Sequence, residues 1–154
     1  IGQKENRALA LMRNKVKTEL IDIPYRDAII SYTVTNTNSS KEVIIDEEIN
    51  VDLKINLEGY LQEYIIEEGK TTYNNEVLRD MERAIEKGVK KEIEDTIKLL
   101  QNEYNADVIG VGEHLSKFNS KAWAQIKGNW VKMFPDVKFN VTVDAKIRRT
   151  GLTK

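Results

Sequence analysis

The chain has 154 residues, a length typical of one domain, and it carries 24 basic against 25 acidic side chains. This balance argues against a nucleic-acid-binding domain, which is usually net basic. The lack of cysteine excludes disulfides and thiolate metal sites, and a single histidine excludes a histidine-rich metal site. No apolar run approaches the 18 or so residues of a membrane-spanning helix. The start at Ile1 instead of Met leads us to expect a piece of a longer protein.

The first third of the chain predicts one helix and two strands. Apolar residues at helical spacing predict a short amphipathic helix over 3–14. β-branched and apolar residues predict strands over 15–23 and 26–35, separated by Pro24. Residues 36–41 (NTNSSK) predict a loop, because their side chains readily hydrogen-bond to their own backbone.

Residues 42–58 show the clearest strand pattern, with apolar side chains at odd positions and polar ones at nearly all even positions. A period of two predicts a strand with one buried face and one hydrated face. Glu47 interrupts the apolar row. This indicates either a bend or bulge at 46–48 or a charge on the buried row. Residues 59–75 favour no single structure.

A long helix is predicted near 76–104. Its apolar residues recur every three or four positions, as on one face of a helix: Leu78, Met81, Ile85, Val89, Ile93, Ile97, Leu100 and Tyr104. On the hydrated face, Glu86 and Lys90, and likewise Glu94 and Lys98, have the spacing of i,i+4 ion pairs.

Two shorter helices and a strand complete the pattern. Asp107 is placed to cap a helix over 108–118, and Ser120 to cap another over 121–133. Residues 137–147 alternate apolar and polar side chains and predict the last strand. We therefore expect a single α+β domain over residues 1–154, with two layers. A mostly antiparallel or mixed sheet of about four strands carries helices on one face.

Candidate chemistry is sparse. GVGEH (110–114) contains a G-x-G, but Leu115 stands where a dinucleotide fingerprint needs a third glycine, so we interpret it as close helix packing. His114 has no evident partner for general base catalysis. Several carboxylates are interleaved with Lys and Arg, as on a solvated helix face: Glu82, Glu86, Glu92, Glu94 and Asp95. A small hydrolase that uses such carboxylates and His114 remains the enzymatic alternative.

Aromatic and basic residues suggest contacts instead. Trp123, Trp130 and Phe134 have helical spacing, which favours a core position over a ligand platform, although Trp also anchors protein interfaces. The C-terminal strand carries three basic residues on its polar row, which we predict to contact a partner: Lys138, Lys146 and Arg148.

Arg149 falls on the apolar row of the same strand. An unpaired buried arginine is costly, so either the strand has ended or Arg149 has a carboxylate partner. Glu47 is the other charge on an apolar row. We predict that Glu47 and Arg149 form a structural ion pair.

Several segments resemble the C-terminal domain of the spore germination receptor C-subunit, or Ger(x)C, lipoprotein family. The specific ones are NADVIGVGEHL (105–115), Trp123 and Trp130 seven residues apart, FPDV (134–137) and IRRTGL (147–152). RALALMRNK (7–15) and INVDLKINLEGYLQEY (49–64) also resemble the family, so the resemblance extends over nearly the whole chain.

The resemblance implies a non-enzymatic module of a nutrient-germinant receptor, with no catalytic, cofactor-binding or metal-binding residues. Family members are lipid-anchored through an upstream cysteine on the outer face of the spore inner membrane. They assemble there with two integral-membrane subunits, A and B. The resemblance thus predicts a soluble fragment of a lipoprotein that requires no cofactor and binds no nucleic acid. Direct sensing of a small molecule is a further alternative.

Overall fold

The computed structural model describes residues 2–14, 19–61 and 75–148. A first helix is followed by three strands: α1 (Gln3–Met12), β1 (Glu19–Tyr25), β2 (Ala28–Ile45) and β3 (Ile49–Leu61). The long helix α2 (Asn75–Leu99) continues into a π-helical turn, η2 (Leu100–Tyr104). Short helices and the last strand follow: α3 (Val111–Phe118), α4 (Ser120–Ile126), η3 (Lys127–Asn129), α5 (Trp130–Met133), η4 (Phe134–Asp136) and β4 (Lys138–Ile147).

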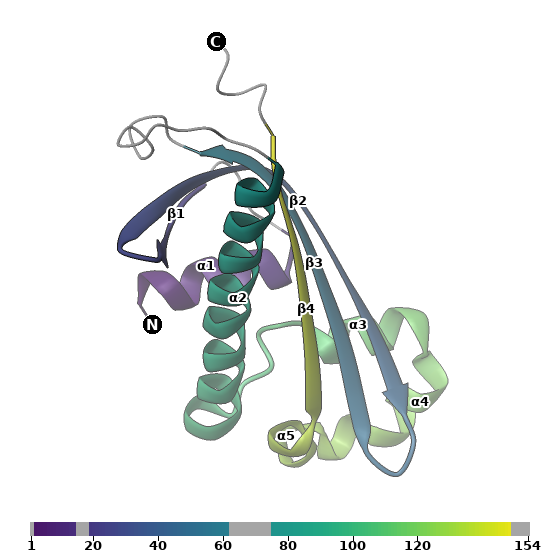
Figure 1. The fold of residues 1–154 in the computed structure, drawn as a ribbon. Helices are drawn as coiled ribbons and strands as arrows, with labels where there is room; N and C mark the ends of the chain where they lie inside the picture. Colours follow the sequence, from purple (N-terminus) through teal and green to yellow (C-terminus); the bar gives the residue numbers. More distant parts are fainter. Residues whose placement is uncertain (1, 15–18, 62–74, 149–154) are drawn as a thin grey trace.

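The four strands form one mixed sheet in the order β1-β2-β3-β4 (Figure 1). β1 and β2 are antiparallel and joined by a two-residue hairpin, in which Arg26 has a positive φ of 55°. β2 and β3 are also antiparallel, and residues 46–48 connect them. β4 lies parallel to β3 because the helices between them carry the chain back to the other end of the sheet.

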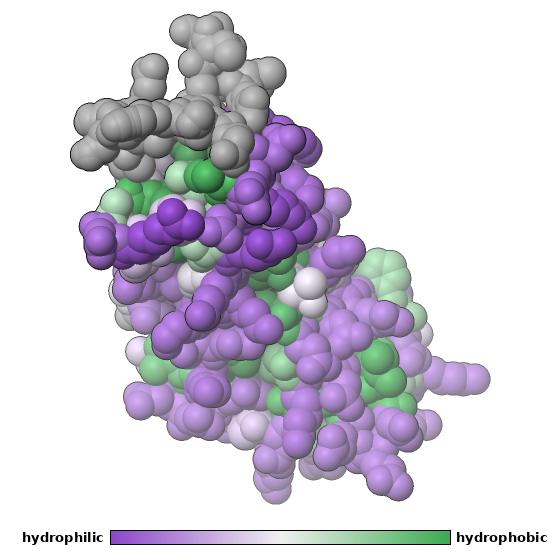
Figure 2. Space-filling view, viewed as in Figure 1, coloured by the Kyte–Doolittle hydropathy of each residue, from purple (hydrophilic) through white to green (hydrophobic). Residues whose placement is uncertain are grey.

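Helices cover one face of this sheet, as predicted. The odd-numbered residues of β3 and β4 are buried, except for the partly buried Phe139, and share one core with the apolar stripe of α2 and with Leu11 of α1. Phe134 and Trp130 of the later helices close the same core. The two-layer α+β architecture and the long helix over 75–104 are therefore confirmed. Hydrophilic residues predominate on the described surface in the view of Figure 2, with only small hydrophobic patches between them.

The predicted loop at 36–41 is wrong, because these residues lie inside β2. They pair with 53–58 of β3, so hydrogen bonds from a distant strand outweigh their turn preference. The register shifts between Val34 and Asn36, opposite Gly59. A Cβ atom at Gly59 would lie only 2.1 Å from the backbone oxygen of Thr33. The bulge therefore needs glycine at this position.

A hairpin turn at residues 46–48 divides the strand predicted over 42–58, so the bend expected there is confirmed and a buried charge at Glu47 is wrong. The backbone N–H of Asp46 donates to the oxygen of Glu48 at 3.0 Å, and Glu47 is an exposed residue of this turn. The apolar alternation continues through the turn because the register pairs odd residues with odd ones, such as Ile45 with Ile49. The break at Glu47 is therefore the one mark of the turn in this pattern.

Boundaries elsewhere shift by a few residues. Pro24 lies inside β1 and does not separate two strands. β1 is an edge strand, and an edge strand tolerates proline because the missing N–H need not pair with a neighbouring strand. Residues 15–18 of the first predicted strand lie outside the described residues. Asn119, not Ser120, caps α4 by accepting from the N–H of Ala122 at 3.3 Å.

Candidate interaction surface

The face of the sheet opposite the helices is polar. On β3 it presents Asn50, Asp52, Lys54, Asn56 and Glu58, and on β4 it presents Lys138, Asn140, Thr142, Asp144 and Lys146. We call these residues the helix-free face. The amide of Asn140 donates to the carboxylate of Asp52 at 3.0 Å across the two strands. Cations, carboxylates and amides alternate here, so the face offers hydrogen bonds and charge of both signs to a partner.

The three basic residues predicted to contact a partner lie along one row but do not form one basic patch. Lys138 pairs with Glu48 at 3.9 Å, Lys146 with Asp144 at 3.4 Å, and Arg148 with Glu58 at 2.7 Å. Lys138 and Lys146 are eight residues apart, or roughly 26 Å at about 3.3 Å per residue. Each cation is thus neutralised locally, and the row is not a basic site.

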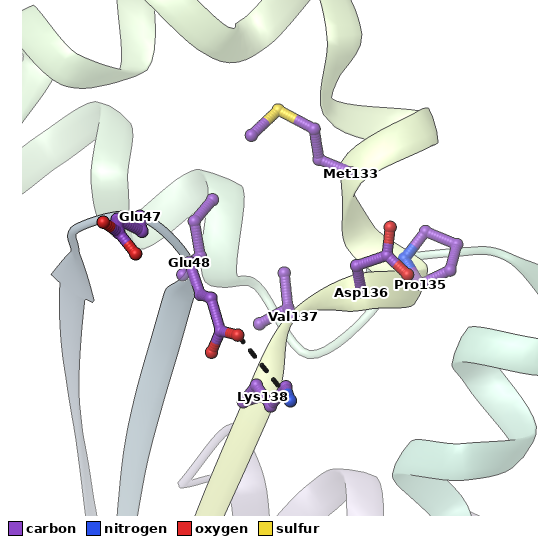
Figure 3. A pocket seen from close by; sticks show the side chains of 8 residues that line it. Glu47, Glu48, Met133, Pro135, Asp136, Val137 and Lys138 are labelled. Carbon is purple, nitrogen blue, oxygen red and sulfur yellow. Dashed lines mark ion pairs between the residues drawn. The ribbon is translucent and has the colours of Figure 1, made fainter.

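Lys138 borders a surface pocket of about 570 Å³ at the hairpin end of the sheet (Figure 3). The hairpin contributes Glu47 and Glu48, while Asp136, Pro135 and Met133 line the pocket from the helical side. Its carboxylates outnumber its one cation, so it suits a cationic group better than an anionic one. Arg149 lies outside the described residues, and the Glu47–Arg149 ion pair stays a prediction.

The helix carboxylates that were candidates for hydrolysis have structural partners instead. Glu82 accepts from the backbone N–H of Ile147 at 2.9 Å, and Glu86 accepts from that of Ala145 at 2.9 Å. These N–H groups lie on the free edge of β4, which α2 covers. The predicted Glu86–Lys90 ion pair is therefore wrong. The spacing of Glu86 and Lys90 along the helix carries no information about the strand edge that lies beside Glu86.

The other three candidate carboxylates of α2 form ion pairs. Glu92 binds the guanidinium of Arg7 through both oxygens, with a shortest distance of 2.8 Å, and this pair fixes α1 against α2. Asp95 pairs with Lys91 at 2.9 Å, and Glu94 with Lys90 at 4.0 Å.

The GVGEH segment supports helix packing around Asp107. One oxygen of Asp107 accepts from the N–H groups of Gly110 and Val111, at 3.0 and 3.1 Å. The other accepts from the N–H of Gly112 at 2.8 Å and from the indole of Trp130 at 3.0 Å. Asp107 thus binds the first N–H groups of α3, as predicted, but α3 begins at Val111 with Gly110 as its N-cap residue and not at 108. The bond of Asp107 to Trp130, 23 residues away, had no signal in the sequence.

Glycine is required at both ends of this G-x-G for packing. Gly110 has a φ of 95°, a conformation that side chains disfavour. A Cβ at Gly112 would lie 2.8 Å from the ring of Trp123. Trp123 and Trp130 then meet edge to face with ring centroids 5.7 Å apart. Trp130 and Phe134 are buried, as the core interpretation of these aromatics predicted, whereas Trp123 is half-buried.

His114 stacks against Phe118, with ring centroids 4.7 Å apart. Burial and, second, the nearby Lys41 ammonium lower the pKa of the imidazole. The described residues include no group of three or more His, Cys, Asp or Glu side chains placed to hold a metal ion. Nor do they include a helix that is both long and apolar enough to cross a bilayer.

Comparison with known proteins identifies relatives among spore germination proteins. Residues 1–151 match the family described as "Spore germination B3/GerAC like, C-terminal". Spore germination protein KC of Bacillus subtilis (strain 168) is 30% identical over 106 residues, which cover 66% of this chain and 25% of that protein. Spore germination protein YndF of the same organism is 26% identical over 126 residues, covering 81% of this chain and 31% of that protein.

The fold agrees with this match. The crystal structure of the GerBC protein superimposes with a TM-score of 0.85 at 17% sequence identity, covering 96% of this chain and 46% of that one. The chain spans only a quarter to a third of the length of these two curated relatives. Since the family match covers nearly every residue, the chain belongs to the spore germination B3/GerAC-like family, in the region that defines its C-terminal part.

Proposed function

We propose that this domain is a non-enzymatic interaction module of a germinant-receptor C-subunit. In this proposal it lies on the outer face of the spore inner membrane, held by a lipid anchor upstream of this domain. There it contacts the integral-membrane A and B subunits. Membership of a germination family supports the setting. The structural uses of Glu82, Glu86 and Glu92 support a role without catalysis, since these carboxylates hold the fold together.

The helix-free face is the observation that carries this proposal. It extends over β3 and β4 and has one polar row on each strand. Along β4 it carries Lys138, Asp144 and Lys146, and both lysines have a carboxylate neighbour. Such a pattern selects a partner by charge complementarity and register more than by hydrophobic area. We therefore assign this face, and not the helical side, to subunit contact.

The test reverses one charge on each side of the domain in the full-length lipoprotein. Lys54→Glu changes the helix-free face, and Lys87→Glu changes an exposed position of α2. Neither lysine has an ion pair among the described residues, so both substitutions should leave folding intact. Co-purification with the A and B subunits and nutrient-triggered germination are the readouts.

Lys54→Glu is expected to reduce both co-purification and germination, while Lys87→Glu behaves as wild type. Equal behaviour of the two variants would reject the helix-free face as the contact. Normal germination and assembly after deletion of the whole domain would reject the interaction function itself.

A further inference from the structure

Lys41 is a charged residue on the helix-covered side of the sheet. It pairs with the buried Leu53 of β3 and belongs to the same row of β2 as Ser39 and Val43. Its side chain is half-buried. A lysine on such a row is expected to have a carboxylate partner. However, no ion pair of Lys41 occurs among the described residues; its hydrogen bond goes to the backbone oxygen of Met12, at 3.4 Å.

The C-terminal end of α1 stabilises the positive charge of Lys41 only in part. A cation at a helix C-terminus is favourable, and the hydroxyl of Ser39 donates to the same oxygen of Met12, also at 3.4 Å. The ammonium group has three donors. Within the described part of the chain, only one of these donors is used, in a long hydrogen bond to the Met12 carbonyl that Ser39 also binds. The other two are available to a ligand.

A pocket of about 340 Å³ opens beside Lys41. Arg13 from the end of α1 and His114 and Lys117 from α3 line it together with Lys41. Glu113 is the carboxylate in its lining, and it pairs with Arg13 at 3.4 Å and with Lys117 at 3.9 Å. Three cations thus face one carboxylate, so the pocket carries a net positive charge even with His114 neutral.

A second carboxylate, Asp107, is not part of the pocket lining, but its charge partly offsets that of Lys41. Both oxygens of Asp107 already accept hydrogen bonds from α3 and from the indole of Trp130. Burial, and then the Arg13 guanidinium, lower the pKa of Lys41. Burial and the Lys41 ammonium lower the pKa of His114. Burial is the larger cause in both groups, and a neighbouring cation adds to it.

We propose that this pocket binds a phosphate-bearing anion, with Lys41 and Arg13 as its main ligands and Lys117 at its rim. A guanidinium fork and an ammonium group are the usual phosphate donors in proteins. The excess of two cations matches the charge of a phosphate monoester near neutral pH. The pocket lies on the helix side, so this proposal is independent of docking through the helix-free face.

His114 provides the readout, because it is the one histidine of the chain. The imidazole signals are followed by proton NMR as inorganic phosphate is added at constant ionic strength, over a range of pH. Phosphate is expected to shift these signals saturably and to raise the pKa of His114. Lys41→Gln is expected to weaken phosphate binding at least tenfold. Lys54→Gln, on the opposite face of the same strand pair, is expected to leave it unchanged.

Lys117→Gln is a second variant at an exposed position, for the case that Lys41→Gln impairs folding. Vesicles of phosphatidylglycerol, compared with phosphatidylcholine, distinguish a lipid headgroup from a free anion. A response to phosphatidylglycerol alone that Lys41→Gln or Lys117→Gln weakens supports the site, with lipid as the source. Several results would overturn the proposal: an equal effect of chloride, no response to phosphate or to phosphatidylglycerol vesicles, or unchanged binding in both variants.

Discussion

Replacing Asp107 by alanine tests the interpretation of the GVGEH segment as a packing device. The substitution removes the acceptor of three backbone N–H groups at the start of α3 and of the Trp130 indole. Loss of a helix cap costs about 0.5–2 kcal/mol. A buried indole N–H left without a partner costs about 1–3 kcal/mol more. We therefore expect Asp107→Ala to lower the free energy of unfolding by about 2–4 kcal/mol.

Asparagine at the same position separates the two contributions. Asp107→Asn retains one oxygen for Gly110 and Val111, but its amide nitrogen cannot accept from Trp130 and Gly112. Its destabilisation should therefore lie between those of wild type and Asp107→Ala. Glu103→Ala, at an exposed position of η2, serves as the matched control and should change little.

Urea unfolding followed by tryptophan fluorescence measures these differences. For a domain of this size, 3 kcal/mol corresponds to a fall in Tm of about 6–12 °C. The reasoning is refuted if Asp107→Ala costs less than about 0.5 kcal/mol, or if the alanine and asparagine variants are equally destabilised. Either result would mean that α3 and Trp130 do not depend on the Asp107 oxygens.

Three further substitutions test other contacts. Glu82→Ala leaves the N–H of Ile147 without its acceptor and should cost about 1–3 kcal/mol in urea unfolding, whereas an equally stable variant would show that α2 does not secure the β4 edge. Gly59→Ala places a methyl group against the Thr33 oxygen and should cost about 1–3 kcal/mol; the control Gly128→Ala, with open space around it, should not. The pKa of His114 is lower in the folded state than its unfolded value of about 6.5. The neutral imidazole therefore favours folding above pH 6.5, and this contribution to stability is lost as the pH falls through the folded-state pKa. His114→Gln should thus reduce the fall in Tm below pH 6.5, and an unchanged pH profile would contradict this.

Patterns set by burial could be predicted from the sequence. The apolar stripe of α2 and the alternating residues of β3 and β4 indicate which side of each element faces the core. These elements, and the placement of the helices on one face of the sheet, could therefore be predicted. The cap formed by Asp107 also followed, because a cap depends on residues three to five positions away.

Features that depend on distant partners could not be predicted in this way. Residues 36–41 form a strand because β3 supplies their hydrogen bonds. Glu86 binds Ala145, 59 residues away, and not its helical neighbour Lys90. At the Lys41 pocket, the four basic side chains come from the end of α1, from β2 and from α3. Their spacing in the sequence carries no sign of this convergence.

The parallel position of β4 has a consequence for how the protein is made. β2 and β3 can pair as soon as their hairpin leaves the ribosome, but the other edge of β3 must await a strand 88 residues further along. Until then, the edge of β3 that later pairs with β4 presents unpaired N–H and C=O groups beside an apolar face. Such an edge readily pairs with another chain. A chain cut before Lys138 is thus expected to aggregate, whatever the stability of its helices.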